Sequence, residues 1–350
     1  MDCIKPAKNP ALFSVQHFCL HDGPGTRSII FFKGCPLRCV WCQNPESWSR
    51  KAELAYKHTL CIDCKICVDV CPEKAIVAPG EWDADKCTLC FKCVDACPSG
   101  AMARFGESQA VEDILEELKP EYSFYENSNG GVTLSGGEVT LFPEYASELS
   151  GRLKEDGIHV AIETCGQFRL DDDTFQKASN EILGTSIKSS VWKLISKVDL
   201  VLFDIKVFEN TKHKELCGVG NDEIKQNFIT LTQLAREKLG PKVWPRLPLI
   251  PGMTSSPENL KSWAAFLLEN RIDQLTVVPY HNLGSPKRAW IGMEPAPDIP
   301  SLSDENLNQS IKVLKDAGIR CYSPGEESWN EEQSNDDEHQ APRTLIRSDA

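Results

Sequence analysis

The sequence lacks any apolar run long enough to cross a membrane. No stretch approaches the roughly eighteen uninterrupted apolar residues that indicate a spanning helix, and the start, Met-Asp-Cys-Ile-Lys-Pro, lacks the charged-then-apolar pattern of an export signal. We therefore expect no membrane partner and a cytoplasmic location. Positive charge is also in deficit, since 38 Lys and Arg face 51 Asp and Glu and leave a formal net charge of −13 at pH 7. This balance argues against a nucleic-acid partner.

The chain is, by contrast, long and rich in cysteine. Its 350 residues are enough for one large α/β barrel domain or two ordinary domains. Its 16 cysteines would suggest a disulfide scaffold in a short secreted protein, but here most of them fall into tight groups. Metal binding in a reducing compartment is therefore the better interpretation. Residues 323–350 form an acidic tail with little to bury, and we expect that tail to be disordered.

The first cysteine group has the pattern C-x3-C-x2-C and consists of Cys35, Cys39 and Cys42. One short loop thus supplies three thiolates, which leaves a four-iron cluster one ligand short. A cluster with four protein ligands can pass electrons, whereas an open iron can also bind a substrate. The missing ligand predicts an enzyme. An exposed iron also predicts oxygen sensitivity and an anaerobic process.

A second array repeats the pattern C-x2-C-x2-C-x3-C-P twice, with a period of 26 residues. This is the bacterial ferredoxin pattern, in which the fourth cysteine of each run ligates the other cluster. It predicts two closed [4Fe-4S] clusters, one held by Cys61, Cys64, Cys67 and Cys97, the other by Cys71, Cys87, Cys90 and Cys93. Zinc ribbons are the weaker alternative, because they use pairs of C-x2-C knuckles. The pattern leaves open whether the two clusters relay electrons or only support the structure.

Hydrophobic periodicity predicts an α/β chain with this array as an insert at residues 49–106. The catalytic loop would then lie in residues 1–48, and the rest of the barrel in residues 107–322. Strands are expected at 27–32, 131–135, 158–162, 199–205, 243–249, 274–279 and 319–322. Helices are expected at 111–118, 143–154, 222–238, 257–270 and 304–317. This alternation predicts a parallel sheet, closed part of the way into a (β/α)6 barrel.

Polar groups stand where these strands end. The successive strand ends carry Cys35, then Ser135-Gly136-Gly137-Glu138, Glu163-Thr164-Cys165-Gly166, Asp204-Ile205-Lys206 and Pro279-Tyr280-His281, while Arg246 lies within the 243–249 strand. Because the C-terminal ends of parallel strands share one rim, these residues should converge. Each of these residues, taken alone, could have a purely structural role in a turn or as a solvated cap. Their convergence on one face is what indicates a functional site.

The combination resembles a known family. The three-cysteine loop, the preceding Asp22-Gly23-Pro24-Gly25-Thr26-Arg27, the Ser-Gly-Gly-Glu strand end and Pro-Tyr-His look like radical S-adenosylmethionine enzymes that activate glycyl radical enzymes, in the branch with a ferredoxin-like insert. The resemblance runs from about residue 12 to residue 322. It implies that the open iron chelates S-adenosylmethionine and that one electron cleaves it to methionine and a 5′-deoxyadenosyl radical. That radical takes hydrogen from a glycine Cα in the partner enzyme, and a flavodoxin or ferredoxin supplies the electron.

Residue roles follow from the same resemblance. Ser135, Gly136, Gly137 and Glu138 would line the methionine amino end, Asp204-Ile205-Lys206 and His281 the carboxylate or ribose, and Trp41-Cys42-Gln43 the adenine. Glu163, Thr164 and Asp204 would bind a monovalent cation, although the family has Asp where this chain has Glu163. Asp22 would orient the partner's glycine loop. The family's usual proline after the Gly-Gly-Glu motif is Val139 here, which loses the fixed φ.

Two other functions stay open on the sequence. The chain could be a radical S-adenosylmethionine enzyme acting on a small molecule or a peptide, or an electron-transfer iron–sulfur protein, and cleavage of S-adenosylmethionine separates the enzymes from the carrier. The sequence does not identify the partner enzyme, the oligomeric state or the role of the long segment 171–193. The remaining cysteines are expected to be ordinary thiols, with Cys165 next to the cation site; they are Cys3, Cys19, Cys165, Cys217 and Cys321.

Overall fold

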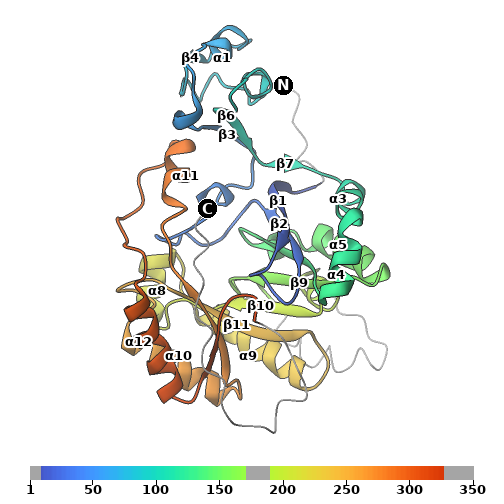
Figure 1. Ribbon diagram of the computed structural model, residues 1–350, viewed down its shortest axis with the longest axis vertical. Coiled ribbons are helices and arrows are strands. Elements are labelled where there is room, and N and C mark those ends of the chain that lie inside the picture. Colours follow the sequence, from blue (N-terminus) through green and yellow to red (C-terminus); the bar gives the residue numbers. More distant parts are fainter. Residues whose placement is uncertain (1–8, 171–189, 327–350) are drawn as a thin grey trace.

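The computed structural model describes residues 9–170 and 190–326, and they form a mostly parallel open sheet flanked by helices (Figure 1). Its strand order is β13-β12-β11-β10-β9-β8-β2-β1-β7. The strands of this sheet are β1 (Ala11–Cys19), β2 (Arg27–Phe32), β7 (Glu107–Ser108), β8 (Gly131–Gly136), β9 (His159–Thr164), β10 (Leu200–Asp204), β11 (Lys242–Leu249), β12 (Gln274–Pro279) and β13 (Arg320–Tyr322). The predicted 171–193 segment lies largely outside the described residues, as does most of the acidic tail.

Strands β2 and β8 to β13 run parallel, which agrees with the predicted α/β class. The sequence prediction missed β1, which pairs antiparallel with β2, and β7, which pairs with β1. Strand β1 reads Ala-Leu-Phe-Ser-Val-Gln-His-Phe-Cys, and its second half is exposed. Its irregular polar pattern explains why periodicity alone did not reveal it.

The helices surround the sheet and pack on its outer face. They are α3 (Val111–Leu118), α4 (Tyr122–Ser128), α5 (Pro143–Glu155), α7 (Ser190–Ile195), α8 (Asn210–Cys217), α9 (Asp222–Arg236), α10 (Pro257–Glu269), α11 (Ser285–Trp290) and α12 (Asp304–Asp316). Helix α3 buries Val111, Ile114, Leu115 and Leu118, the i, i+3, i+4, i+7 spacing of an amphipathic helix. Among the described residues, no helix is long and apolar enough to cross a membrane.

Alternation along the strands separates the core from the site. In β10, Val201 and Phe203 join the large core under the helices, whereas Leu200 and Leu202 face a second, smaller cluster with Trp244. Side chains of a strand point alternately to opposite faces, so the inner face of β11 also carries Arg246, two residues after Trp244. The inner face thus becomes polar toward the C-terminal ends of the strands.

Residues 49–106 form a separate lobe beyond the edge of the main sheet (Figure 1). It contains β3 (Glu53–Tyr56) paired with β6 (Met102–Phe105), a hairpin of β4 (Ile76–Ala78) and β5 (Glu81–Trp82), and the short helices α1 (Ile66–Asp69) and α2 (Lys92–Asp95). Asp63 and Lys65 have positive φ, and so do Leu89 and Phe91, 26 residues further on. The sequence repeat is therefore also a backbone repeat.

The lobe is tied to the main sheet by an ion pair whose lysine is buried and whose glutamate is partly exposed. Lys33, directly after β2, is fully buried, and its Nζ lies 2.6 Å from Glu53 Oε2 on β3. The same Nζ donates to the carbonyl of Glu46. Burial lowers the pKa of Lys33, and Glu53 opposes that shift. The first cysteine loop is thereby flanked by a fixed junction between sheet and lobe.

Candidate active site

The three-cysteine loop leaves the end of β2 and is held by backbone hydrogen bonds from distant parts of the chain. Arg38 N–H donates to the carbonyl of Cys217 at 2.7 Å, and Val40 N–H to that of Leu216 at 3.0 Å. On the other side, the Oε1 of Gln43 accepts from Gly284 N–H at 2.9 Å. The loop geometry therefore depends on α8 and on the start of α11 as well as on its own sequence.

The loop opens onto a cavity of about 340 Å³ at the C-terminal ends of the strands. Most of the residues predicted for the site line this one cavity: Asp22, Cys35, Cys39, Trp41, Cys42, Gln43, Ser135, Gly136, Gly137, Glu163, Thr164, Asp204 and Lys206. Arg246 and Cys165 line it too. The predicted convergence of strand ends on one rim is therefore present in the fold.

The glycine pair after β8 is required by its packing. Gly136 has φ +110°, and a Cβ there would lie 2.2 Å from the backbone nitrogen of Phe32. A Cβ on Gly137 would lie 2.1 Å from the carbonyl oxygen of Gly34. Only glycine allows β8 to end this close to the start of the cysteine loop. The pair thus brings backbone groups of β8 to the cavity wall.

Glu138 occupies a different place from the one expected. Its side chain is fully buried and does not line the cavity. The carboxylate accepts hydrogen bonds from the Thr140 N–H and hydroxyl, the Thr164 hydroxyl and the Cys165 N–H, at 2.7–3.1 Å. These donors already satisfy the carboxylate, so we correct its role from ammonium acceptor to a brace between the ends of β8 and β9.

Two other predicted residues also lie off the cavity. Ile205 is fully buried and His281 is exposed, and neither belongs to the lining. Ile205 follows Asp204 in the strand alternation and points into the core with Phe203. His281 lies beyond the end of β12, past the part of the strand that faces the site. A motif at the end of a strand therefore predicts where the site lies, but it does not predict which of its side chains face the cavity.

An ion pair at the end of β10 supplies a fixed positive charge. Lys206 Nζ lies 3.1 Å from Asp204 Oδ2, and its side chain is 10% exposed. Burial lowers the pKa of Lys206, but Asp204 and the thiols of Cys39, Cys165 and Cys217 outweigh it, so the pKa is raised. The ammonium is therefore charged at neutral pH and can bind a carboxylate as a point charge.

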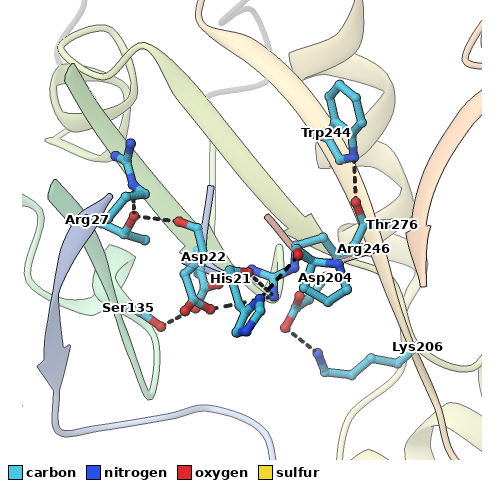
Figure 2. Close-up of polar contacts among 12 residues, drawn as sticks. His21, Asp22, Arg27, Ser135, Asp204, Lys206, Trp244, Arg246 and Thr276 are labelled. Atoms are coloured by element: carbon cyan, nitrogen blue, oxygen red, sulfur yellow. Dashed lines mark hydrogen bonds and ion pairs between the residues drawn. The ribbon is translucent and has the colours of Figure 1, made fainter. Parts of the chain in front are cut away.

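A second charged group joins three strands around Arg246, a residue to which the sequence analysis assigned no role. Arg246 on β11 contacts Glu163 on β9, its Nη2 lies 3.6 Å from Asp22 Oδ1, and Glu163 also accepts from the Ser135 hydroxyl (Figure 2). Burial raises the pKa of Glu163 to about 7, Asp22 and Asp204 add to the shift, and Arg246 opposes it. The available signal was a charge in the middle of a mostly apolar strand, in the same register as Trp244.

The segment before β2 is fixed by Arg27 (Figure 2). Its guanidinium is fully buried and donates to the hydroxyl of Thr133 at 2.7 Å and to the carbonyls of Pro24 and Val132. The Thr133 hydroxyl in turn donates to the carbonyl of Asp22 at 2.7 Å. Arg27 and Thr133 together hold Asp22 at the rim of the cavity.

The eight cysteines of the lobe surround two further cavities. One is lined by Cys61, Cys64, Cys67 and Cys97, and the other by Cys71, Cys87, Cys90 and Cys93. These are the two sets that the crossed ferredoxin pairing groups together. Burial raises the pKa of Cys71, but hydrogen bonds from the backbone N–H groups of residues 73–76 outweigh burial and lower that pKa below its usual value.

Both kinds of cysteine set fit [4Fe-4S] clusters. Among the described residues, no three His, Cys, Asp or Glu side chains converge closely enough for a single metal ion. A cubane instead takes thiolates at separate corners, which suits cysteines placed around a space. Four thiols around each lobe cavity fit a closed cluster, and three around the main cavity fit an open one.

These features define the class of the protein. The model of the radical SAM superfamily matches residues 29–264, and the chain belongs to this superfamily. The matched segment contains the cysteine loop, the lobe and β8 to β11.

Similarity to characterised relatives narrows the class. The chain is 37% identical over 309 residues to the choline trimethylamine-lyase activating enzyme of Oleidesulfovibrio alaskensis, covering 85% of this chain and 92% of that protein. It is 38% identical over 287 residues to the trans-4-hydroxy-L-proline dehydratase activating enzyme of Clostridioides difficile, covering 80% and 87%. It is 32% identical over 325 residues to the indoleacetate decarboxylase activating enzyme of Tractidigestivibacter scatoligenes, covering 89% and 96%. The chain is therefore an enzyme of the radical SAM group that activates glycyl radical enzymes.

Proposed function

We propose that this chain installs a radical on a glycine of a partner glycyl radical enzyme, using S-adenosylmethionine and an open [4Fe-4S] cluster on Cys35, Cys39 and Cys42. One observation carries the proposal. The three thiols, the positive charge of Lys206 and the carboxylate of Asp22 line the same cavity at the strand ends. A cluster, a bound cosubstrate and a glycine loop would all meet there.

The residues of the cavity suit the two ends of the methionine group. Lys206 offers a fixed ammonium to its carboxylate. Ser135, Gly136 and Gly137 offer backbone carbonyls to its amino group, because the glycine pair brings β8 against the cysteine loop. Trp41 and Gln43, on the loop itself, line the same cavity and would contact the adenine. These residues would hold the cosubstrate in the cavity that the three thiols also line.

The chemistry that the cluster supplies is one electron to the sulfonium, which yields methionine and a 5′-deoxyadenosyl radical. Asp22 would hold the partner's glycine loop at the rim, where two glycines and a proline allow another backbone to approach. The radical takes one hydrogen atom from the glycine Cα and becomes 5′-deoxyadenosine, and the unpaired electron stays on the glycine.

The lobe would carry two closed clusters in a ferredoxin-like arrangement. Its position beside β2, through the Lys33 and Glu53 pair, supports a path for electrons from a flavodoxin or ferredoxin toward the main cavity. The identity of the partner is a separate matter. The three relatives are named for a lyase, a dehydratase and a decarboxylase, and we assign this chain only to the shared class of partner.

The test is electron paramagnetic resonance on anaerobically reconstituted protein, reduced and mixed with S-adenosylmethionine and a candidate glycyl radical enzyme. We expect a stable organic doublet together with about one 5′-deoxyadenosine per radical. Deoxyadenosine without a doublet would point to a wrong partner or to a small-molecule or peptide substrate. Absence of both products would overturn the proposal.

A further inference from the structure

The guanidinium of Arg246 lies between two carboxylates at the rim of the cavity (Figure 2). It contacts Glu163 Oε1 through Nη1 and lies 3.6 Å from Asp22 Oδ1 through Nη2. The Arg246 side chain is 8% exposed, and that of Glu163 is 18% exposed. The guanidinium of Arg246 therefore lies beside Glu163, one of the residues that the family resemblance implies as ligands of a monovalent cation.

Most of the side-chain oxygens expected to ligate a monovalent cation already have a protein partner: both oxygens of Glu163, the Thr164 hydroxyl and one oxygen of Asp204. Glu163 is paired with Arg246 and accepts from the Ser135 hydroxyl. The Thr164 hydroxyl donates to Glu138 Oε1 at 2.8 Å and accepts from Gly166 N–H at 3.0 Å. Asp204 Oδ2 is paired with Lys206 Nζ at 3.1 Å. These three residues therefore do not fit the cation site that the sequence predicted.

The length of Glu163 explains the arrangement. Strand β10 lies between β9 and β11, with Leu202 paired to Glu163 on one side and to Trp244 on the other. The carboxylate must therefore reach over a full strand toward Arg246, a span of about 10 Å between the outer strands. An aspartate at position 163 would be one methylene shorter, and its carboxylate would not reach the guanidinium of Arg246. Glutamate at this position and arginine on β11 act as a matched pair.

We infer that Arg246 takes the place of the monovalent cation, so that this chain binds S-adenosylmethionine without Na⁺ or K⁺. Arg246 is a positioning residue in this role. It holds Glu163 and Asp22 through charge and leaves the cosubstrate to the loop, the glycine pair and Lys206. The inference rests on the proposed function, since it concerns the same cosubstrate.

The first test compares salts on the wild-type protein with its clusters in place. The dissociation constant of S-adenosylmethionine is measured by equilibrium dialysis, anaerobically, in KCl, NaCl and tetramethylammonium chloride at equal ionic strength. We expect the three values to agree within about twofold, because a protein charge-assisted pair replaces the ion. Binding about tenfold tighter in K⁺ or Na⁺ than in tetramethylammonium would overturn the inference. No binding in any salt would instead overturn the proposed function.

Two variants make the test sharper. Glu163→Asp and Arg246→Met each break the pair and leave carboxylate oxygens for an ion, so their affinity should fall about tenfold in tetramethylammonium and recover in K⁺. Arg246→Lys, which keeps the charge, should stay independent of the salt, and Arg320→Met, at an exposed ion pair with Asp273, is the matched control. Circular dichroism checks folding of the Arg246 variants. Variants with wild-type affinity in every salt would contradict the assigned role.

Discussion

At the scale of single residues, the site depends on buried polar groups that are matched in pairs. Arg27 is fully buried and still pairs with the hydroxyl of Thr133 and two carbonyls, and its Nη2 lies 3.3 Å from His159 Nδ1. Burial lowers the pKa of Arg27 to about 10, so its guanidinium stays charged at neutral pH. Its neighbour His159 must then stay neutral.

The state of His159 gives a pH prediction. Burial lowers its pKa from 6.5 to about 4, and Arg27 adds to the shift. The unfolded chain therefore takes up a proton between these values while the folded protein does not, so stability is full above pH 6.5 and falls as pH decreases toward 4. By about pH 5 the loss is about 2 kcal/mol of unfolding free energy. Anaerobic urea unfolding of the wild type and His159→Gln should show the loss in the wild type alone; equal losses would contradict it.

At the scale of helices and strands, periodicity predicted the seven parallel strands and the long helices, because each has a continuous apolar face. It missed β1, whose second half is exposed, and α8, which has few buried residues. The strand-end motifs and the family resemblance also put Ile205 and His281 in the site, although neither lines the cavity, because the pleat of a strand decides which side chains at its end face inward. Arg246 received no role, since its partners come from other strands.

The lobe gives a prediction at this scale. Replacing both Cys64 and Cys90 by Ala removes one ligand from each lobe cavity and should lower the iron content from about twelve to about four atoms per chain. If the clusters relay electrons, activation with flavodoxin should slow about tenfold while activation with dithionite is unchanged. Cys321→Ala, outside both arrays, is the control. Iron loss with an unchanged flavodoxin rate would assign the clusters a structural role.

At the scale of the whole molecule, the cavity separates two tasks. The thiols, Lys206 and Asp22 all line it, but the Lys206 side chain is 10% exposed whereas that of Asp22 is 25% exposed, with its backbone held by Thr133 and its carboxylate facing Arg246. We assign cleavage of the cosubstrate to the thiols and Lys206, and hydrogen transfer from the partner's glycine to the neighbourhood of Asp22. The sequence motif preceding β2 predicted this position, but the support from Thr133 needed the folded sheet, since the two residues are 111 positions apart.

This separation predicts that Asp22→Ala uncouples the two tasks. Deoxyadenosine formation without partner should stay near the wild-type rate, because the thiols and Lys206 are untouched. The yield of glycyl radical should fall about tenfold or more, because an orienting contact of this kind is worth about 1.5–3 kcal/mol. The radical is counted by electron paramagnetic resonance, with the exposed Asp316→Ala as control. Activation at the wild-type rate would remove Asp22 from the partner's binding site.

The contacts that hold the cysteine loop also bear on when, during synthesis of the chain, its cluster can be inserted. Gln43 and its partner Gly284 are 241 positions apart. At translation rates of about 5–20 residues per second, the loop leaves the ribosome more than about ten seconds before Gly284 is made. Until then its thiols are exposed on an unfinished barrel. We therefore expect iron insertion at Cys35, Cys39 and Cys42 to follow synthesis of the segment around Gly284, whose N–H completes the contacts of the loop.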